Sequence, residues 1–159
     1  LLRASISLGP KEGAPFREQA IGHMRAFMKG MDIQPDGSFY ATFELATGRP
    51  LFPRVREGWT HLPQESPGGW ANGVVPLRAP FNLAFACKVT GAEDFRAAFD
   101  RFLPLFPLER FEQLDGPAQD ISAGMMAQAI VALLQMQQAT GAASYLDKAR
   151  PLRRYAIAH

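Results

Sequence analysis

Residues 57–70 hold the side chains whose types and spacing best suit ligand chemistry. Both tryptophans of the chain, Trp59 and Trp70, lie in this stretch together with Glu57 and His61. An indole ring stacks well on the apolar C–H face of a sugar, while planar polar groups bind the hydroxyls at its rim. The stretch therefore predicts a sugar-binding loop. The alternative, about equally supported, is that the two indoles fill a gap between neighbouring elements.

Other site chemistries have little support in the sequence. His23, His61 and His159 share no helical spacing with one another, and no carboxylate cluster accompanies them, so we predict no metal site. Cys87 is the single cysteine, which excludes an internal disulfide, and its apolar neighbours predict a buried thiol that packs as a small hydrophobe. The chain lacks the glycine-rich motifs of nucleotide sites and the motif of a serine nucleophile elbow. We therefore expect no cofactor.

Composition narrows the class of protein further. The chain has 159 residues, of which 47% are hydrophobic and 20% charged, as expected for one folded domain. A net charge of +2 is too small to indicate nucleic-acid binding. The longest apolar run, around Met125 to Met136, is interrupted by glutamines and is too short to cross a bilayer. The sequence leaves the compartment open between cytoplasm and periplasm.

An internal repeat organises the second half of the chain. Thr90-Gly91-Ala92 recurs fifty residues later as Thr140-Gly141-Ala142, and each copy follows an apolar stretch of helical period. Glycine can adopt the left-handed conformation that ends a helix, so each copy predicts two helices joined by a tight turn. A weaker third copy is centred on Leu8-Gly9, with a helix through Met28.

A change of period from 3.6 to 2 predicts a β-hairpin between the first and second helical hairpins. Residues 38–45 read as one strand, Thr47-Gly48-Arg49-Pro50 as a turn, and residues 51–55 as an edge strand that contains Pro53. The expected organisation is one mainly α domain over 1–159: a helical hairpin remnant (1–31), a β-hairpin and cleft loop (32–76), and two further helical hairpins (77–108 and 109–159). Successive αα-hairpins are typical of an α/α solenoid or toroid, of which three would form an arc.

Several motifs resemble the C-terminal half of unsaturated glucuronyl hydrolases, glycoside hydrolase family 88, which is related to family 105. The residues that carry this resemblance are Pro35–Tyr40, Glu44–Pro50, Glu57-Gly58-Trp59, Trp70, Leu83-Ala84 with Thr90-Gly91, and Asp120–Ala123. The resemblance implies an (α/α)6 barrel of twice this size. It also implies a bacterial enzyme of polysaccharide degradation that removes a Δ4,5-unsaturated uronic acid from oligosaccharides. Because the chain starts at Leu1 without an initiator Met, we expect it to be part of a larger protein, with the missing half of the barrel as its partner.

The resemblance assigns no catalytic residue within this chain. In the family, a pair of aspartates protonates the substrate and guides water, and both precede the segment that the chain matches. Asp36 and Asp120 match other positions and are expected at a turn and at a helix N-cap. The implied substrate-binding residues are Glu57, Trp59, His61, Trp70 and Arg78.

The sequence departs from the family pattern at three positions. Ala41 stands where the family has a histidine, and Glu57 stands where it has a glutamine. The arginine expected shortly after Trp70 is missing at its place, and Arg78 is the nearest residue that could compensate. A carboxylate facing a uronate would repel it, so the substrate could differ from that of the family.

Two other functions remain open from the sequence. A noncatalytic α/α-hairpin module that binds carbohydrate or another protein would retain the helices without the chemistry. More remotely, Gln34-Pro35-Asp36-Gly37-Ser38 resembles the Gln-rich turns of type II terpene cyclases, although only one such motif is present.

Overall fold

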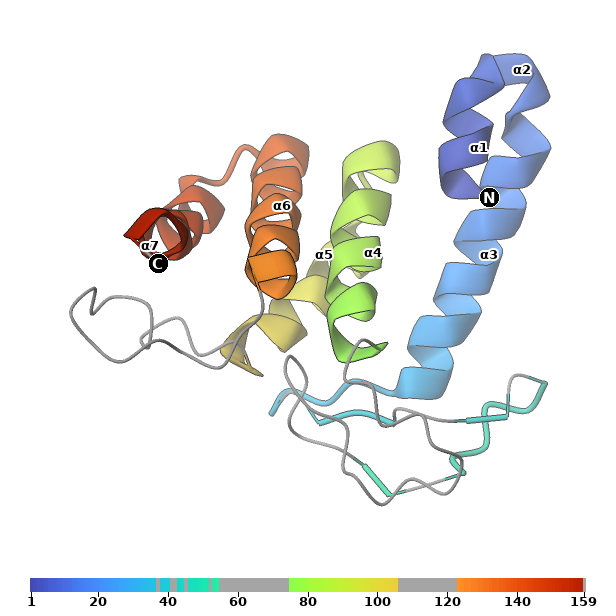
Figure 1. Cartoon of the computed structure of the whole chain (residues 1–159). Coiled ribbons are helices and arrows are strands. Elements are labelled where there is room, and N and C mark those ends of the chain that lie inside the picture. Colours follow the sequence, from blue (N-terminus) through green and yellow to red (C-terminus); the bar gives the residue numbers. More distant parts are fainter. Residues whose placement is uncertain are drawn as a thin grey trace.

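The computed structural model describes residues 1–36, 38–40, 43–44, 46–51, 53–54, 75–105 and 123–158, and these residues are mainly helical (Figure 1). The helices in this part of the chain are α1 (Leu2–Ser7), α2 (Gly9–Glu12), α3 (Ala14–Met31), α4 (Val75–Thr90), α5 (Glu93–Phe102), α6 (Ala123–Thr140) and α7 (Ala143–Ala158). A 3-10 turn, η1 (Leu103–Leu105), follows α5. The prediction of a mainly α domain is confirmed for these residues.

Helices α4 and α5 form the first copy of the predicted repeat. The Thr90 hydroxyl donates a hydrogen bond to the Ala86 carbonyl at 2.7 Å and accepts one from the Ala92 amide at 3.1 Å. Gly91 lies at φ +68°, and its N–H donates to the Cys87 carbonyl at 2.7 Å. The left-handed glycine ends α4, and the threonine ties that end to the start of α5.

Helices α6 and α7 repeat this turn. The Thr140 hydroxyl donates to the Met136 carbonyl at 2.7 Å and accepts from the Ala142 amide at 3.2 Å. Gly141 lies at φ +73°, and its N–H donates to the Gln137 carbonyl at 2.8 Å. The same bonds recur at a separation of fifty residues, so the repeat predicted from the sequence is confirmed.

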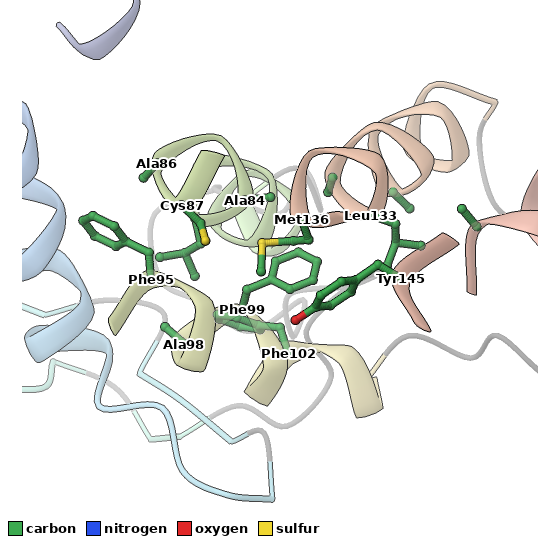
Figure 2. Close-up of a cluster of buried hydrophobic side chains, with 14 of the residues drawn as sticks. Ala84, Ala86, Cys87, Phe95, Ala98, Phe99, Phe102, Leu133, Met136 and Tyr145 are labelled. Carbon is green, nitrogen blue, oxygen red and sulfur yellow. The ribbon is translucent and has the colours of Figure 1, made fainter. Parts of the chain in front are cut away.

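The two hairpins share one core. Helix α4 packs against both α5 and α6, and α6 packs against α7. Figure 2 shows the aromatic side chains of α5, among them Phe99, below α4 and α6, with Met136 of α6 and Tyr145 of α7 beside them. The rings of Phe99 and Tyr145 meet edge to face with centroids 6.1 Å apart. Burial of these large side chains is the main stabilising contribution here.

A third hairpin precedes these two. Helix α1 packs on α3, and the short helix α2 joins them. Helix α2 begins at Gly9, which lies at φ +80°. The guanidinium of Arg3 on α1 lies over the Phe85 ring of α4, with 5.2 Å between Cζ and the ring centroid. In Figure 1, α1, α4 and α6 run in one direction, while α3 and α5 run in the opposite one. The weak third copy was therefore correctly predicted as helical, with α2 as an insertion.

The predicted β-hairpin is wrong for the described residues of 38–55. An isolated antiparallel bridge joins Phe43 to Pro50, and the Glu44 amide donates to the Arg49 carbonyl at 2.9 Å. The predicted turn at Thr47-Gly48 is present, since Gly48 lies at φ +73°. Proline has no N–H to donate, so Pro50 and Pro53 cannot donate hydrogen bonds to a ladder here.

Candidate functional site

The residues predicted to bind sugar lie largely beyond what the structure describes. Glu57, Trp59, His61 and Trp70 fall outside the described residues. Arg78 lies in the first turns of α4 by its backbone, and its side chain is also outside the described set. The structure therefore brings none of these side chains together, and what it gives is the frame that flanks residues 55–74.

That frame is one end of the helical arrangement. Helices α4 and α6 both begin at this end, where α3 and α5 finish, and the described residues between 32 and 54 lie below the lower ends of α3 and α4 (Figure 1). The amino end of a helix carries partial positive charge. Two parallel helices that begin side by side thus favour an anionic group more than a neutral one at this end.

A rim cluster of Asp32, Gln34, Tyr40 and Arg54 orders the segment that leads into residues 55–74. The Arg54 guanidinium lies over the Tyr40 ring, with 4.1 Å between Cζ and the ring centroid, and forms an ion pair with the Asp32 carboxylate. Its Nη1 also donates to the Asp32 carbonyl at 2.6 Å. The Gln34 amide donates to the same carboxylate at 2.9 Å.

Asp32 can serve this cluster because it ends α3 in the left-handed conformation, at φ 45°. Aspartate tolerates that conformation better than most residues, which is the sequence signal that we missed at this position. With Arg54 held by Asp32 and Tyr40, the cluster fixes the chain at the carboxyl end of α3. It does not present a free cation to a ligand.

Ile33 and Phe39, which lie next to the rim cluster in the sequence, are anchored to α5. Phe39 is buried and packs edge to face on Phe102, with ring centroids 5.3 Å apart. The Arg101 guanidinium donates to the Ile33 carbonyl at 2.9 Å. Asp36 occupies the predicted turn, where its carboxylate accepts a hydrogen bond from the Ser38 amide at 3.0 Å.

Two carboxylates of α5 are engaged by neighbouring helices. Arg25 of α3 donates to Asp94 at 2.7 Å, and this hydrogen bond holds the pKa of the Asp94 carboxyl below its ordinary value. Asp100 accepts a hydrogen bond from the Tyr145 hydroxyl at 2.6 Å. Burial, reinforced by that bond, raises the pKa of Tyr145 to about 12. Both aspartates are thus hydrogen-bond acceptors that join helices.

A groove of ≈ 440 Å3 lies between α3 and α4 and reaches Met31, which precedes Asp32 of the rim cluster. Its walls are mainly apolar and include Met24, Phe27 and Met28 of α3 and Leu83 of α4, with His23 and Asn82 as the polar contributors. The sequence predicted a helix through Met28 but gave no indication of this groove. We refer to it below as the α3/α4 groove.

Cys87 has the environment that was predicted for it. Its side chain is 3% exposed, and burial raises the pKa of the thiol. Within the described ranges, no three histidine, cysteine or carboxylate side chains come together as a possible metal site. Among those same residues, no helix combines the length and apolar character that crossing a membrane requires.

Comparison of the chain with protein-family models finds no matching family, and comparison with curated proteins and with solved structures finds no match either. The class of protein that the structure itself defines is a mainly helical protein built from αα-hairpins. Any more specific function rests on the residues and geometry described above.

Proposed function

We propose that this chain forms an arc of an α/α toroid of the (α/α)6 type and belongs to a carbohydrate-active glycoside hydrolase. Its substrates would be oligosaccharides of the kind that unsaturated-uronide hydrolases cleave. The observation that carries the proposal is the parallel course of α1, α4 and α6, with α3 and α5 running in the opposite direction (Figure 1). This alternation is the building pattern of α/α-hairpin arcs.

The sugar would bind at the end where α4 and α6 begin. The rim cluster holds Arg54 at the carboxyl end of α3, and α4 starts at Val75. Trp59, Trp70 and His61 on this segment would supply the stacking surface and a hydrogen-bonding group. The amino ends of the helices favour the carboxylate of a uronic acid.

Charge at the proposed site would set the preference between acidic and neutral sugars. Glu57 adds a negative charge that opposes a uronate, and Arg78 adds a positive charge that attracts it. We therefore expect Glu57→Gln to strengthen binding of unsaturated uronides and Arg78→Gln to weaken it. Neither change should alter binding of a neutral oligosaccharide as strongly.

Intrinsic tryptophan fluorescence tests the proposal directly, because Trp59 and Trp70 are the two tryptophans of the chain. Titration with lyase-derived unsaturated oligosaccharides should change the emission of the chain, and Trp59→Phe and Trp70→Phe should each weaken binding without lowering the melting temperature. Phe16→Leu, at an exposed aromatic position in the first turn of α3, is the matched control and should bind normally. Unchanged emission over the full titration would refute a sugar site on residues 57–70.

A noncatalytic binding module is the second candidate, and one observation favours it. A general acid needs a carboxyl group whose pKa is raised toward neutrality. Asp94 is instead held ionised by Arg25, and Asp32 is paired with Arg54. Saturable binding of oligosaccharides without release of unsaturated uronic acid, measured on the longest natural form of the protein, would select the module over the hydrolase.

A further inference from the structure

Exposed apolar side chains gather in the two outer hairpins of the arc. Helices α4 and α5, which lie between those hairpins (Figure 1), expose no large hydrophobic among their described side chains. Large apolar residues that gather on exposed surfaces mark interaction sites. Those of the first hairpin and of the last are Leu1, Ile6, Leu8, Phe16, Phe27, Val131, Leu134 and Ile157.

The internal repeat shows which face of α6 is open. At the repeat distance of fifty residues, Leu134 of α6 corresponds to Ala84 of α4, and Val131 corresponds to Phe81. Ala84 is fully buried on the side of α4 next to α6 (Figure 2), whereas Leu134 is 36% and Val131 41% exposed. The face with which α4 contacts α6 therefore recurs on α6 as an exposed surface, which we call the α6 face.

Leu1 and Leu8 form a comparable surface at the other end of the arc, which we call the α1 face. They flank α1, Leu8 has helical backbone angles, and residues seven apart share one face of a helix. Arg3, which lies over the Phe85 ring of α4, is two residues from Leu1 and hence about 160° around the helix from it. The α1 face thus lies on the side of α1 away from α4.

The α6 face has the polarity of an interface and not that of an ordinary exposed helix. The 18 residues of α6 include no aspartate, glutamate, lysine or arginine. A helix face in contact with water is normally charged or polar, whereas the centres of protein interfaces are depleted in charge. The α6 face therefore suits an apolar partner such as the α1 face, where Leu1 is 57% and Leu8 43% exposed.

We propose that the α6 face of one copy of this chain binds the α1 face of a second copy, and that two copies close into a ring of six hairpins. Helices α1, α4 and α6 run in one direction (Figure 1), so a two-fold axis along that direction would set α1 of the second copy parallel to α6, as α4 already is. Head-to-tail contacts form a closed ring when the rotation between copies closes, and this ring would contain the contact twice.

The second copy would supply the missing half of the barrel. The number of copies rests on the proposed (α/α)6 toroid. The contact between the α1 face and the α6 face does not, because it follows from the exposed leucines and from the repeat.

Complementation between two charge variants tests this contact. Leu134→Glu and Leu8→Lys each place a charge in both contacts of the ring. Each variant should therefore be monomeric in sedimentation equilibrium at concentrations where the wild type has twice the monomer mass. In an equal mixture of the two variants, one contact unites the opposite charges and the other retains both leucines. The dimer should return in that mixture, and added salt should weaken it.

Two controls separate this contact from other modes of association. Leu51→Glu, at a position 48% exposed outside the helical hairpins, should remain dimeric. A mixture of Leu134→Glu with Leu134→Lys should stay monomeric, because α6 would not face α6 in the ring. Circular dichroism should show the same helix content for all of these variants, since the replaced side chains are exposed.

A second readout introduces no charge. Leu8→Cys mixed with Leu134→Cys should be joined by a short bis-maleimide, and neither variant alone should be joined. The native Cys87 is buried and should not react.

Three outcomes would overturn the proposal: a wild-type chain that is monomeric at every concentration, a mass that grows beyond the dimer, or rescue of Leu134→Glu by Leu134→Lys. The sugar site is judged separately by tryptophan emission. A dimer that does not respond to oligosaccharide would refute the sugar site alone, and a monomer that does respond would refute the ring alone.

Discussion

The helices α4 to α7 and the helices α1 to α3 follow the same hairpin plan but cohere differently. Between α4 and α6, small buried residues such as Ala84 and Ala132 let the inner helices pack closely, and Phe99 fills the space beneath them. Close helix packing of this kind depends on the size of the side chains at the contact. The second half of the chain is therefore joined through a continuous apolar core.

The first hairpin joins the same core through Leu2, Ala20 and Met31, and it also makes polar contacts with the rest at its edges. Arg3 lies over Phe85, Arg25 pairs with Asp94, and Arg101 binds the Ile33 carbonyl. Exposed ion pairs contribute little to the free energy of unfolding. Truncation of a buried aromatic side chain, in contrast, lowers that free energy by several kcal/mol. The comparison teaches that the inner helices α4 and α6 meet along small buried residues, whereas α3 reaches α5 through an exposed ion pair.

The largest expected effect is in the shared core. Phe99 is fully buried, so Phe99→Ala should lower the free energy of unfolding by about 3–5 kcal/mol through lost apolar contact and the cavity left behind. Phe16→Ala, at a position 41% exposed on α3, should change it by less than about 0.5 kcal/mol. Urea denaturation followed by circular dichroism measures both. Equal losses in the two variants would contradict the contrast between the two regions.

Replacing one glycine in each region by alanine should change the free energy of unfolding by an intermediate amount, with opposite signs in the two regions. Gly141 lies at φ +73° with open space around it, so Gly141→Ala should destabilise the α6–α7 turn by about 1–2 kcal/mol through backbone strain alone. Gly22 lies within α3, where an added methyl group meets no neighbour, so Gly22→Ala should stabilise the chain by up to about 1 kcal/mol. Thermal melting of both variants measures these two changes in stability. A stabilising Gly141→Ala would disprove the left-handed turn.

The smallest expected effect comes from Tyr145, which joins α7 to α5 by its hydrogen bond to Asp100. Tyr145→Phe should lower stability by about 1 kcal/mol at neutral pH, the usual net value of one hydrogen bond. Because the pKa of Tyr145 is raised from 10.0 to about 12, the contribution of this group is complete below pH 10 and is lost as the pH rises toward 12. The difference between wild type and variant should therefore shrink over that alkaline window.

Arg25→Gln provides the matching control in the other region, because it removes the exposed ion pair between α3 and α5. The lowered pKa of Asp94 makes that contribution present above the ordinary value of 3.8 and lost as the pH falls through the lowered one. The difference from wild type should thus disappear at high pH for Tyr145→Phe and at low pH for Arg25→Gln. A difference that disappears at high pH for Arg25→Gln, or one that persists there for Tyr145→Phe, would contradict these assignments.

The helical hairpins could be predicted from sequence because their signals are local. A threonine followed by a glycine ends each helix through bonds that reach no further than four residues along the chain, so the repeat of Thr90-Gly91 at Thr140-Gly141 was sufficient. The burial of Cys87 followed from its apolar neighbours in the same way. The β-hairpin was predicted from the change of period, the residue types and the turn signals, and among the described residues only an isolated bridge is seen.

The candidate site was predictable only in part. Trp59 and Trp70 stand out by residue type, but they lie outside the described residues, so the sugar site remains a prediction. The rim cluster depends on Arg54 meeting Asp32, which is 22 residues away, through the left-handed end of α3. No sequence pattern within either segment predicts that contact.

By itself the sequence determined the helices, the turns between them and the apolar faces, because hydrogen bonds and periodicity act over a few residues. Only the tertiary structure decided which of those faces became core. The stripe of α3 and the apolar residues of α5 have the same helical spacing, yet Phe99 meets α6 and α7 whereas Met28 borders the α3/α4 groove. The physical reason is that burial depends on which elements pack against each face, and the spacing within one helix does not encode that.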